Sequence, residues 1–107
     1  MTPNLQVYQA FDRELIAEIP ADDAGALERK LDIAARTFAD RDGWLPAHRR
    51  MAILRRVSEL LFENRDRFAM VIAREGGKPL TDAIIEVTRG IDGLVNAADE
   101  LRNFGGK

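Results

Sequence analysis

The strongest constraint on the fold is an apolar repeat in the last quarter of the chain. Its members step by four and three residues in alternation, the spacing that places side chains on one face of an α-helix. The repeat predicts a long helix over residues 79–104, widened by Ile85 and Val95. Gly90 and Gly93 lie inside it, and glycines there indicate that another backbone passes close by. The apolar positions are Leu80, Ile84, Val87, Ile91, Leu94, Ala98 and Leu101.

Two interpretations of this apolar seam stay open. The seam is either a dimer interface or the face that packs on other helices of the same chain. Its width favours packing within the chain, with the excess left for a partner. Thr81 is placed to cap the start of the helix, and Gly105-Gly106 to end it.

The earlier part of the chain predicts a short β-hairpin followed by helices. Residues 5–20 have the pattern of two strands around a polar turn, and a lone two-stranded ribbon needs something to lean on. A helix over 22–41, capped by Asp22 or Asp23, and a broken helix over 46–75, with Asn64 at the break, follow. Trp44 is expected to fill the gap between them. The predicted fold class is mainly α: three to four helices in a bundle preceded by a short β-hairpin, all within one segment, 1–107.

Composition excludes several classes of function. The 107 residues carry a formal net charge of −2, which gives no electrostatic reason to expect nucleic acid or an anionic membrane as partner. No apolar run approaches the ~20 residues of a membrane span. The chain has no cysteine, which removes thiolate nucleophiles and cysteine metal sites and fits a reducing compartment. We therefore expect a cytoplasmic protein.

Candidate chemical sites each have a plainer structural interpretation. Gly76-Gly77-Lys78 invites comparison with a phosphate-binding loop, yet Pro79 stands where that motif needs Ser or Thr. A joint between two helices, stopped by the glycines, is favoured. His48 has no partner to share a metal, so an exposed histidine is expected. The basic residues near it are followed by acidic ones, which favours a solvated, mutually paired face; they are Arg49, Arg50, Arg55 and Arg56, then Glu59, Glu63 and Asp66.

The order of several short motifs resembles the N-terminal region of the NAD(P)-dependent aldehyde dehydrogenase superfamily. No single motif is specific, but their order and spacing together are, over roughly residues 7–105. Asp12-Arg13 departs from the Pro and Gly that many members have at that turn, and Ser58 from the usual alanine. The motifs are Val7-Tyr8, Glu14-Leu15-Ile16-Ala17-Glu18-Ile19-Pro20, Trp44, Arg50-x-x-x-Leu54, Leu60-Leu61, Glu75-Gly76-Gly77-Lys78-Pro79, Ala83-Ile84-Ile85-Glu86-Val87, Ala97-Ala98 and Gly105.

This resemblance implies a structural part of a larger enzyme. In that family a Rossmann-like α/β domain binds NAD or NADP, a cysteine thiolate attacks the aldehyde, and a glutamate activates water. Those residues would lie beyond this chain, which would end before the cofactor-binding core, so no catalytic, cofactor-binding or metal-binding residue is assigned here. Some members hold a monovalent cation near the start of the last helix; Glu86 is the nearest position, and no site is assigned to it.

The resulting hypothesis is an N-terminal structural segment of an aldehyde dehydrogenase, catalytically inactive alone, whose partner is the remainder of that chain. The alternative is a free-standing helical module for protein–protein interaction or dimerisation, zipped along Leu80 to Leu101. In either case exposed apolar helix faces predict self-association of the isolated chain. A helix–turn–helix nucleic-acid binder is a weaker third possibility, because the charge does not favour it.

Overall fold

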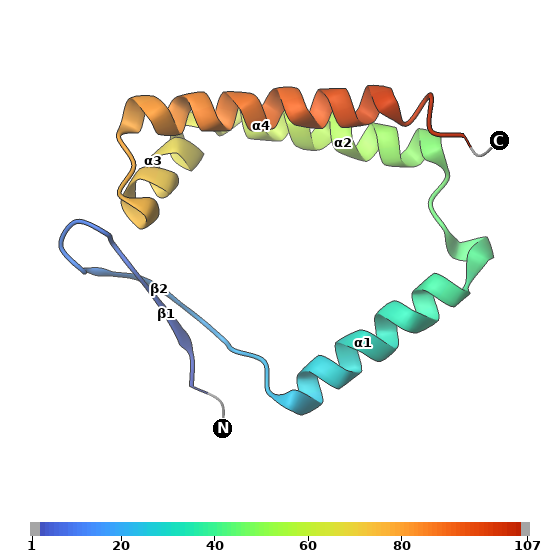
Figure 1. Cartoon of the computed structure of the whole chain (residues 1–107), viewed down its shortest axis with the longest axis horizontal. Helices are drawn as coiled ribbons and strands as arrows, with labels where there is room; N and C mark the ends of the chain where they lie inside the picture. Colours follow the sequence, from blue (N-terminus) through green and yellow to red (C-terminus); the bar gives the residue numbers. More distant parts are fainter. Residues whose placement is uncertain (1–2, 106–107) are drawn as a thin grey trace.

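The computed structural model describes residues 3–105 and is mainly helical, with a β-hairpin at the start (Figure 1). The fold class predicted from the sequence is thus confirmed. In chain order the elements are β1 (Leu5–Tyr8), β2 (Leu15–Ile19), α1 (Ala24–Ala39), the short 3₁₀ helix η1 (Arg41–Gly43), α2 (Ala47–Glu63), α3 (Arg65–Gly76) and α4 (Leu80–Glu100).

The hairpin pairs β1 with β2 in antiparallel register, from Leu5 opposite Ile19 to Tyr8 opposite Leu15. The register shifts between Val7 and Tyr8, which leaves an extra residue on β2 and increases the local twist. In the turn, Arg13 has φ 66°, a left-handed conformation that most side chains avoid. The guanidinium carbon of Arg13 lies 4.8 Å from the centre of the Tyr8 ring, so the ring covers part of the turn.

Helix α1 begins where a carboxylate caps it. Asp23 accepts a hydrogen bond from the Ala26 amide at 2.7 Å, so the predicted cap is Asp23 rather than Asp22. The expectation that Trp44 fills a gap between two helices is wrong. Its ring lies 5.3 Å from that of Phe38, and its Nε1 donates to the Phe38 carbonyl, so it folds back on the end of α1.

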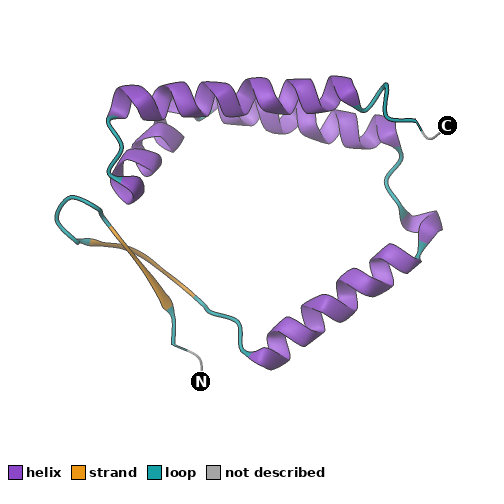
Figure 2. Ribbon diagram, viewed as in Figure 1, coloured by secondary structure: helices purple, strands orange, loops and turns teal. Residues whose placement is uncertain are grey.

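Helices α2, α3 and α4 pack together through small side chains. Figure 2 shows α2 and α4 running side by side, with α3 beside the start of α4. Ser58, on α2, is buried and its hydroxyl lies 3.5 Å from the Ile91 carbonyl of α4. Within residues 3–105 the buried hydrophobic side chains are all small or β-branched: Ala69, Ala83, Val87 and Ala98. Small residues at these points let the helix axes approach closely.

The observed helix α4 differs from the predicted helix in three details. Ala83, not Leu80 or Ile84, provides the buried position in its first turns. Thr81 lies inside the helix, because α4 already begins at Leu80 and Pro79 occupies the capping position. The helix ends at Glu100 rather than at the glycines, of which Gly106 lies outside the described residues.

Within residues 3–105 no other backbone passes close to the glycines of α4, so this part of the chain does not supply the expected close approach. A methyl group added at Gly90 would meet only the Leu61 side chain, at 3.8 Å. At Gly93 it would meet nothing within 4 Å.

Residues 3–105 form an extended ring rather than a compact globule. The hairpin and α1 lie on the side of the ring opposite α2 and α4 (Figure 1). The radius of gyration is 18.3 Å, whereas a compact chain of this length has about 13 Å. The predicted bundle is therefore formed by α2, α3 and α4, and α1 stands apart from it.

Candidate functional site

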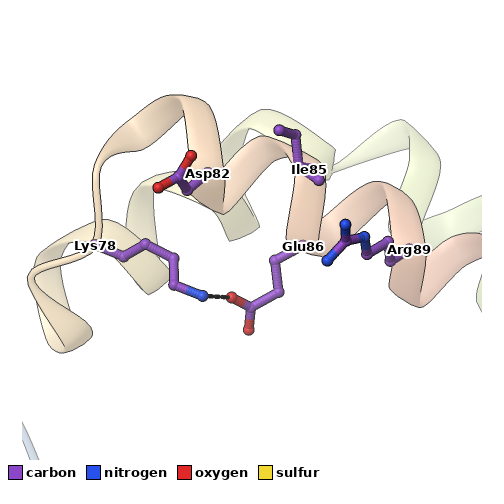
Figure 3. Close-up of a pocket in the computed structure, with 5 residues that line it drawn as sticks. All are labelled: Lys78, Asp82, Ile85, Glu86 and Arg89. Atoms are coloured by element: carbon purple, nitrogen blue, oxygen red, sulfur yellow. Dashed lines mark hydrogen bonds and ion pairs between the residues drawn. The ribbon is translucent and has the colours of Figure 1, made fainter.

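A charged hollow at the start of α4 is the first candidate site (Figure 3). Its volume is about 520 Å³, and it is open to solvent. Lys78 Nζ donates to Glu86 Oε2, and both side chains are about half exposed, so this is a surface ion pair of small energetic weight. The hollow is lined by Lys78, Asp82, Ile85, Glu86 and Arg89.

The glycine turn before this hollow is a joint between two helices, as the sequence favours. Gly77 has φ 67° and ends α3, and its amide donates to the Ala73 carbonyl at 2.9 Å. A phosphate-binding loop must instead point free backbone amides at its ligand. The amide of Gly77 is already used and the Lys78 ammonium is paired, so this turn does not fit the phosphates of a dinucleotide.

The hairpin turn is attached to this same joint, a contact that sequence reasoning missed. The Ala10 amide donates to the Arg74 carbonyl at 2.9 Å, and Arg74 Nε donates to Gln9 Oε1 at 2.8 Å. The two contacts, one of which joins residues 65 positions apart, close the ring. The predicted need of the hairpin for support is thus met by the end of α3. One backbone hydrogen bond and one arginine–glutamine pair between separated positions leave no periodic signal in a sequence.

The basic stretch of α2 is paired only in part, because among the described residues Arg56 alone pairs with the acidic residues expected for it. Arg56 lies 2.9 Å from Glu59 and 3.6 Å from Glu63, and Arg55 lies 3.0 Å from Asp99 on α4. The hydrogen bond that Arg56 donates to the Glu59 carboxylate raises the pKa of the Arg56 guanidinium above its usual value. His48 is exposed. Residues 3–105 contain no group of three or more His, Asp or Glu side chains placed to hold a metal ion.

The surface of α2 and α3 carries a row of half-exposed apolar side chains. The α2–α3 stripe runs along one side of α2 into α3, and its members are Ile53, Val57, Leu60, Phe68 and Val71, each between 41% and 49% exposed. A shallow groove lined by Val57, Leu60 and Phe68 shows that the two helices share this surface. The α1 face, made of Leu27, Leu31 and Phe38, is a second exposed apolar surface. Neither surface carries catalytic chemistry; both are suited to contact another polypeptide.

Comparison with known proteins identifies the family. The sequence model of the aldehyde dehydrogenase family matches residues 2–107. An aldehyde-dehydrogenase-like protein of Sinorhizobium fredii is 31% identical over 103 residues, covering 96% of this chain and 20% of that protein. Malonate-semialdehyde dehydrogenase of Bacillus pumilus is 34% identical over 94 residues, covering 86% of this chain and 19% of that enzyme. The chain spans about a fifth of the length of the curated relatives it matches.

A solved structure shares the fold. The glyceraldehyde-3-phosphate dehydrogenase GapN of Methanocaldococcus jannaschii, crystallised with NADP, superimposes with a TM-score of 0.88 at 24% identity. The match covers 99% of this chain and 23% of that one. The chain therefore belongs to the aldehyde dehydrogenase family. Within that family it corresponds to an N-terminal segment, as the order of its motifs predicts.

Two further properties of the described part bear on function. No helix within residues 3–105 combines the length and the apolar character needed to cross a bilayer. The glycine-rich turn at residues 76–78 follows a helix, and the Gly77 amide already donates to the Ala73 carbonyl. We therefore assign no cofactor contact to any side chain of this part.

Proposed function

We propose that this chain is a structural segment of an NAD(P)-dependent aldehyde dehydrogenase and has no catalytic activity alone. In this proposal the full-length enzyme oxidises an aldehyde to a carboxylic acid, and the segment supports the part that holds NAD or NADP. Family membership and the small share of its relatives' length that the chain spans support the proposal. It places the chain in the cytoplasm, in keeping with a sequence that has no cysteine.

The observation that carries the proposal is the exposed area. The chain exposes 8719 Å², whereas a compact monomer of this mass exposes about 6,000 Å². The difference of about 2,700 Å² belongs to surfaces that a compact protein would cover. No large side chain is fully buried among the described residues, while Leu31, Phe38 and Ile53 are about half exposed or more. Such a chain is built to be covered by further polypeptide.

The catalytic part of the proposal follows from the chemistry of the reaction. The family's aldehyde attack needs a thiolate, and this sequence provides none. We expect the purified chain to produce no NADH or NADPH from a panel of aliphatic and semialdehyde substrates with either cofactor. Absorbance at the reduced-nicotinamide band measures this directly. Turnover above the rate without protein would contradict the proposal.

A second candidate function is a free-standing helical interaction or dimerisation module, and the exposed apolar faces favour it. The two candidates share one expectation, self-association of the isolated chain through those faces. They differ in what covers the faces in the cell. Intact-mass analysis of the product in its source separates them, because a polypeptide several times longer supports the enzyme segment and a 107-residue product supports the module.

A further inference from the structure

The C-terminal end of α3 receives one of its caps from a distant part of the chain. The last four carbonyl groups of a helix have no partner within it. At the end of α3 the Gly77 amide donates to the Ala73 carbonyl, whereas the Arg74 carbonyl accepts from the Ala10 amide of the hairpin turn, at 2.9 Å. The same bond satisfies a backbone donor of the turn, so each segment supplies the partner that the other lacks.

Arg74 holds the hairpin turn at a second point. Its Nε donates to Gln9 Oε1 at 2.8 Å, next to the backbone bond from Ala10. One residue of α3 thus binds two consecutive residues of the turn, one through its carbonyl and the other through its guanidinium. Gly77 leaves room for this approach, because a methyl group there would lie only 3.1 Å from the Ala10 Cβ.

The turn that Arg74 contacts is fixed by hydrogen bonds of its own. The Gln9 amide donates to the Glu14 carbonyl at 2.8 Å, and the Arg13 amide donates back to the Gln9 carbonyl at 3.0 Å. The Glu14 amide also donates to Asp12 Oδ1 at 3.0 Å. Because the turn is stiff, a contact at its first residues fixes the position of the whole hairpin.

The hairpin and α1 together form an arm on the side of the ring opposite α2 and α4 (Figure 1). Within residues 3–105, the hydrogen bonds between this arm and the bundle of α2, α3 and α4 are those that Arg74 makes with Gln9 and Ala10. Helix α1 has its main contacts with η1 instead. The bond between the Arg74 and Gln9 side chains is exposed to solvent, where a hydrogen bond contributes little net stability, and closing the ring costs chain entropy. The arm is therefore held in place weakly and at one position.

We propose that Arg74 is a latch whose two hydrogen bonds hold the arm in the closed ring. When the latch is released, the arm swings about the connection between η1 and α2. The inference concerns contacts within one molecule, so it depends neither on the proposed function nor on what covers the apolar surfaces.

Amide hydrogen exchange at Ala10 tests the latch at the bond itself. Arg74→Met keeps the apolar stem of the side chain but removes its donor, and it should speed exchange at Ala10 by about five- to tenfold. Arg67→Met is the matched control, because the Arg67 guanidinium lies near the Phe68 ring, 5.7 Å from its centre, and it should leave exchange at Ala10 unchanged. The same exchange rate at Ala10 in all three chains would overturn the proposal.

Gln9→Glu approaches the same bond from the hairpin side. A carboxylate accepts a stronger, charge-assisted bond from the guanidinium, so exchange at Ala10 should slow by about two- to fivefold. The slowing should disappear when Gln9→Glu is combined with Arg74→Met, because the two changes act on one contact. Slowing of the same size in the combined variant would contradict the pairing with Arg74.

A distance between two labels tests the movement of the arm. Because the sequence has no cysteine, Glu28→Cys on α1 and Asp92→Cys on α4 provide two unique thiols for spin labels. An excess of unlabelled chain restricts the measured distances to those within one molecule, even where copies associate. The parent and Arg67→Met should give one narrow distance distribution, and Arg74→Met a broader one that extends to longer distances. An unchanged distribution for Arg74→Met, at unchanged helical circular dichroism, would refute the latch and leave the proposed function standing.

Discussion

Gly77 is the residue at which two parts of the ring meet. Its φ of 67° ends α3, and a methyl group placed on it would lie 3.1 Å from the Ala10 Cβ of the hairpin turn. Glycine is needed here twice, for the left-handed backbone and for the close approach of the turn. Gly76, one residue earlier, is helical, and a methyl group there would meet nothing within 4 Å.

Exchanging each glycine for alanine should therefore have opposite effects. Gly77→Ala should lower the free energy of unfolding by about 1–2 kcal/mol, because alanine is strained in the left-handed region. Gly76→Ala should raise it by about 0.5–1 kcal/mol through better helix propensity. Urea unfolding at one fixed protein concentration measures both. Equal effects of the two changes would show that neither the backbone conformation nor the hairpin contact matters.

Predictions about single residues succeeded where one local hydrogen bond determines the conformation. They failed where a neighbouring residue provides another partner for the same group. Asp23 caps α1 because its carboxylate needs only the Ala26 amide, three residues further along the chain. Asn64 lies at the predicted break, yet its amide donates to the Leu60 carbonyl at 2.8 Å instead of capping α3. Thr81 has a capping side chain, but Pro79 already ends the extended segment one residue before α4 begins. The polar contact of Gln9 with Arg74 has no sequence signature at all.

Helix α4 shows which features of an element the spacing of apolar residues predicts and which it does not. The period correctly predicts the long helix and its buried positions Val87 and Ala98. It does not distinguish Ala83 from the larger Ile84 beside it, because hydrophobicity alone ranks isoleucine as the better core residue. Ala83 is fully buried in one cluster with Ala69 and Val87, where its small side chain lets α3 and α4 approach closely. Packing between helices, rather than hydropathy, chooses the small residue.

Ala83→Leu should accordingly destabilise the α3–α4 contact. Three added carbon atoms at a fully buried position force side chains off their rotamers, and we expect a loss of about 1–3 kcal/mol in the free energy of unfolding. Ala97→Leu, on the same helix at an exposed position, is the matched control and should change it by less than about 0.5 kcal/mol. Thermal unfolding followed by circular dichroism compares the two. A stable Ala83→Leu variant would mean that α3 and α4 can separate without cost.

At the scale of the whole molecule, the local patterns predict each element but not their arrangement. The sequence indicates a bundle because four amphipathic helices normally cover one another. In the described residues α1 covers none of the other helices, and the ring is closed only by the contact of the hairpin turn with α3. The apolar face of α1 predicts that this helix packs on another surface, but the sequence of α1 does not specify which surface that is. The chain therefore extends over 52 × 39 × 21 Å.

Because the apolar faces of the isolated chain are exposed, we expect its stability to depend on protein concentration. If copies cover each other, dimerisation adds its free energy to folding, and the unfolding midpoint in urea rises as the total concentration increases. A 100-fold increase shifts the equilibrium between dimer and unfolded chains by about 2.7 kcal/mol, since the dissociated state is favoured by dilution. Leu31→Asp puts a charge on the α1 face and should weaken this dependence, while Ile33→Asp, on the other side of the helix, should keep it. Midpoints that stay constant over that range for the parent chain would show that its apolar faces remain in water, and that only further sequence of the enzyme can cover them.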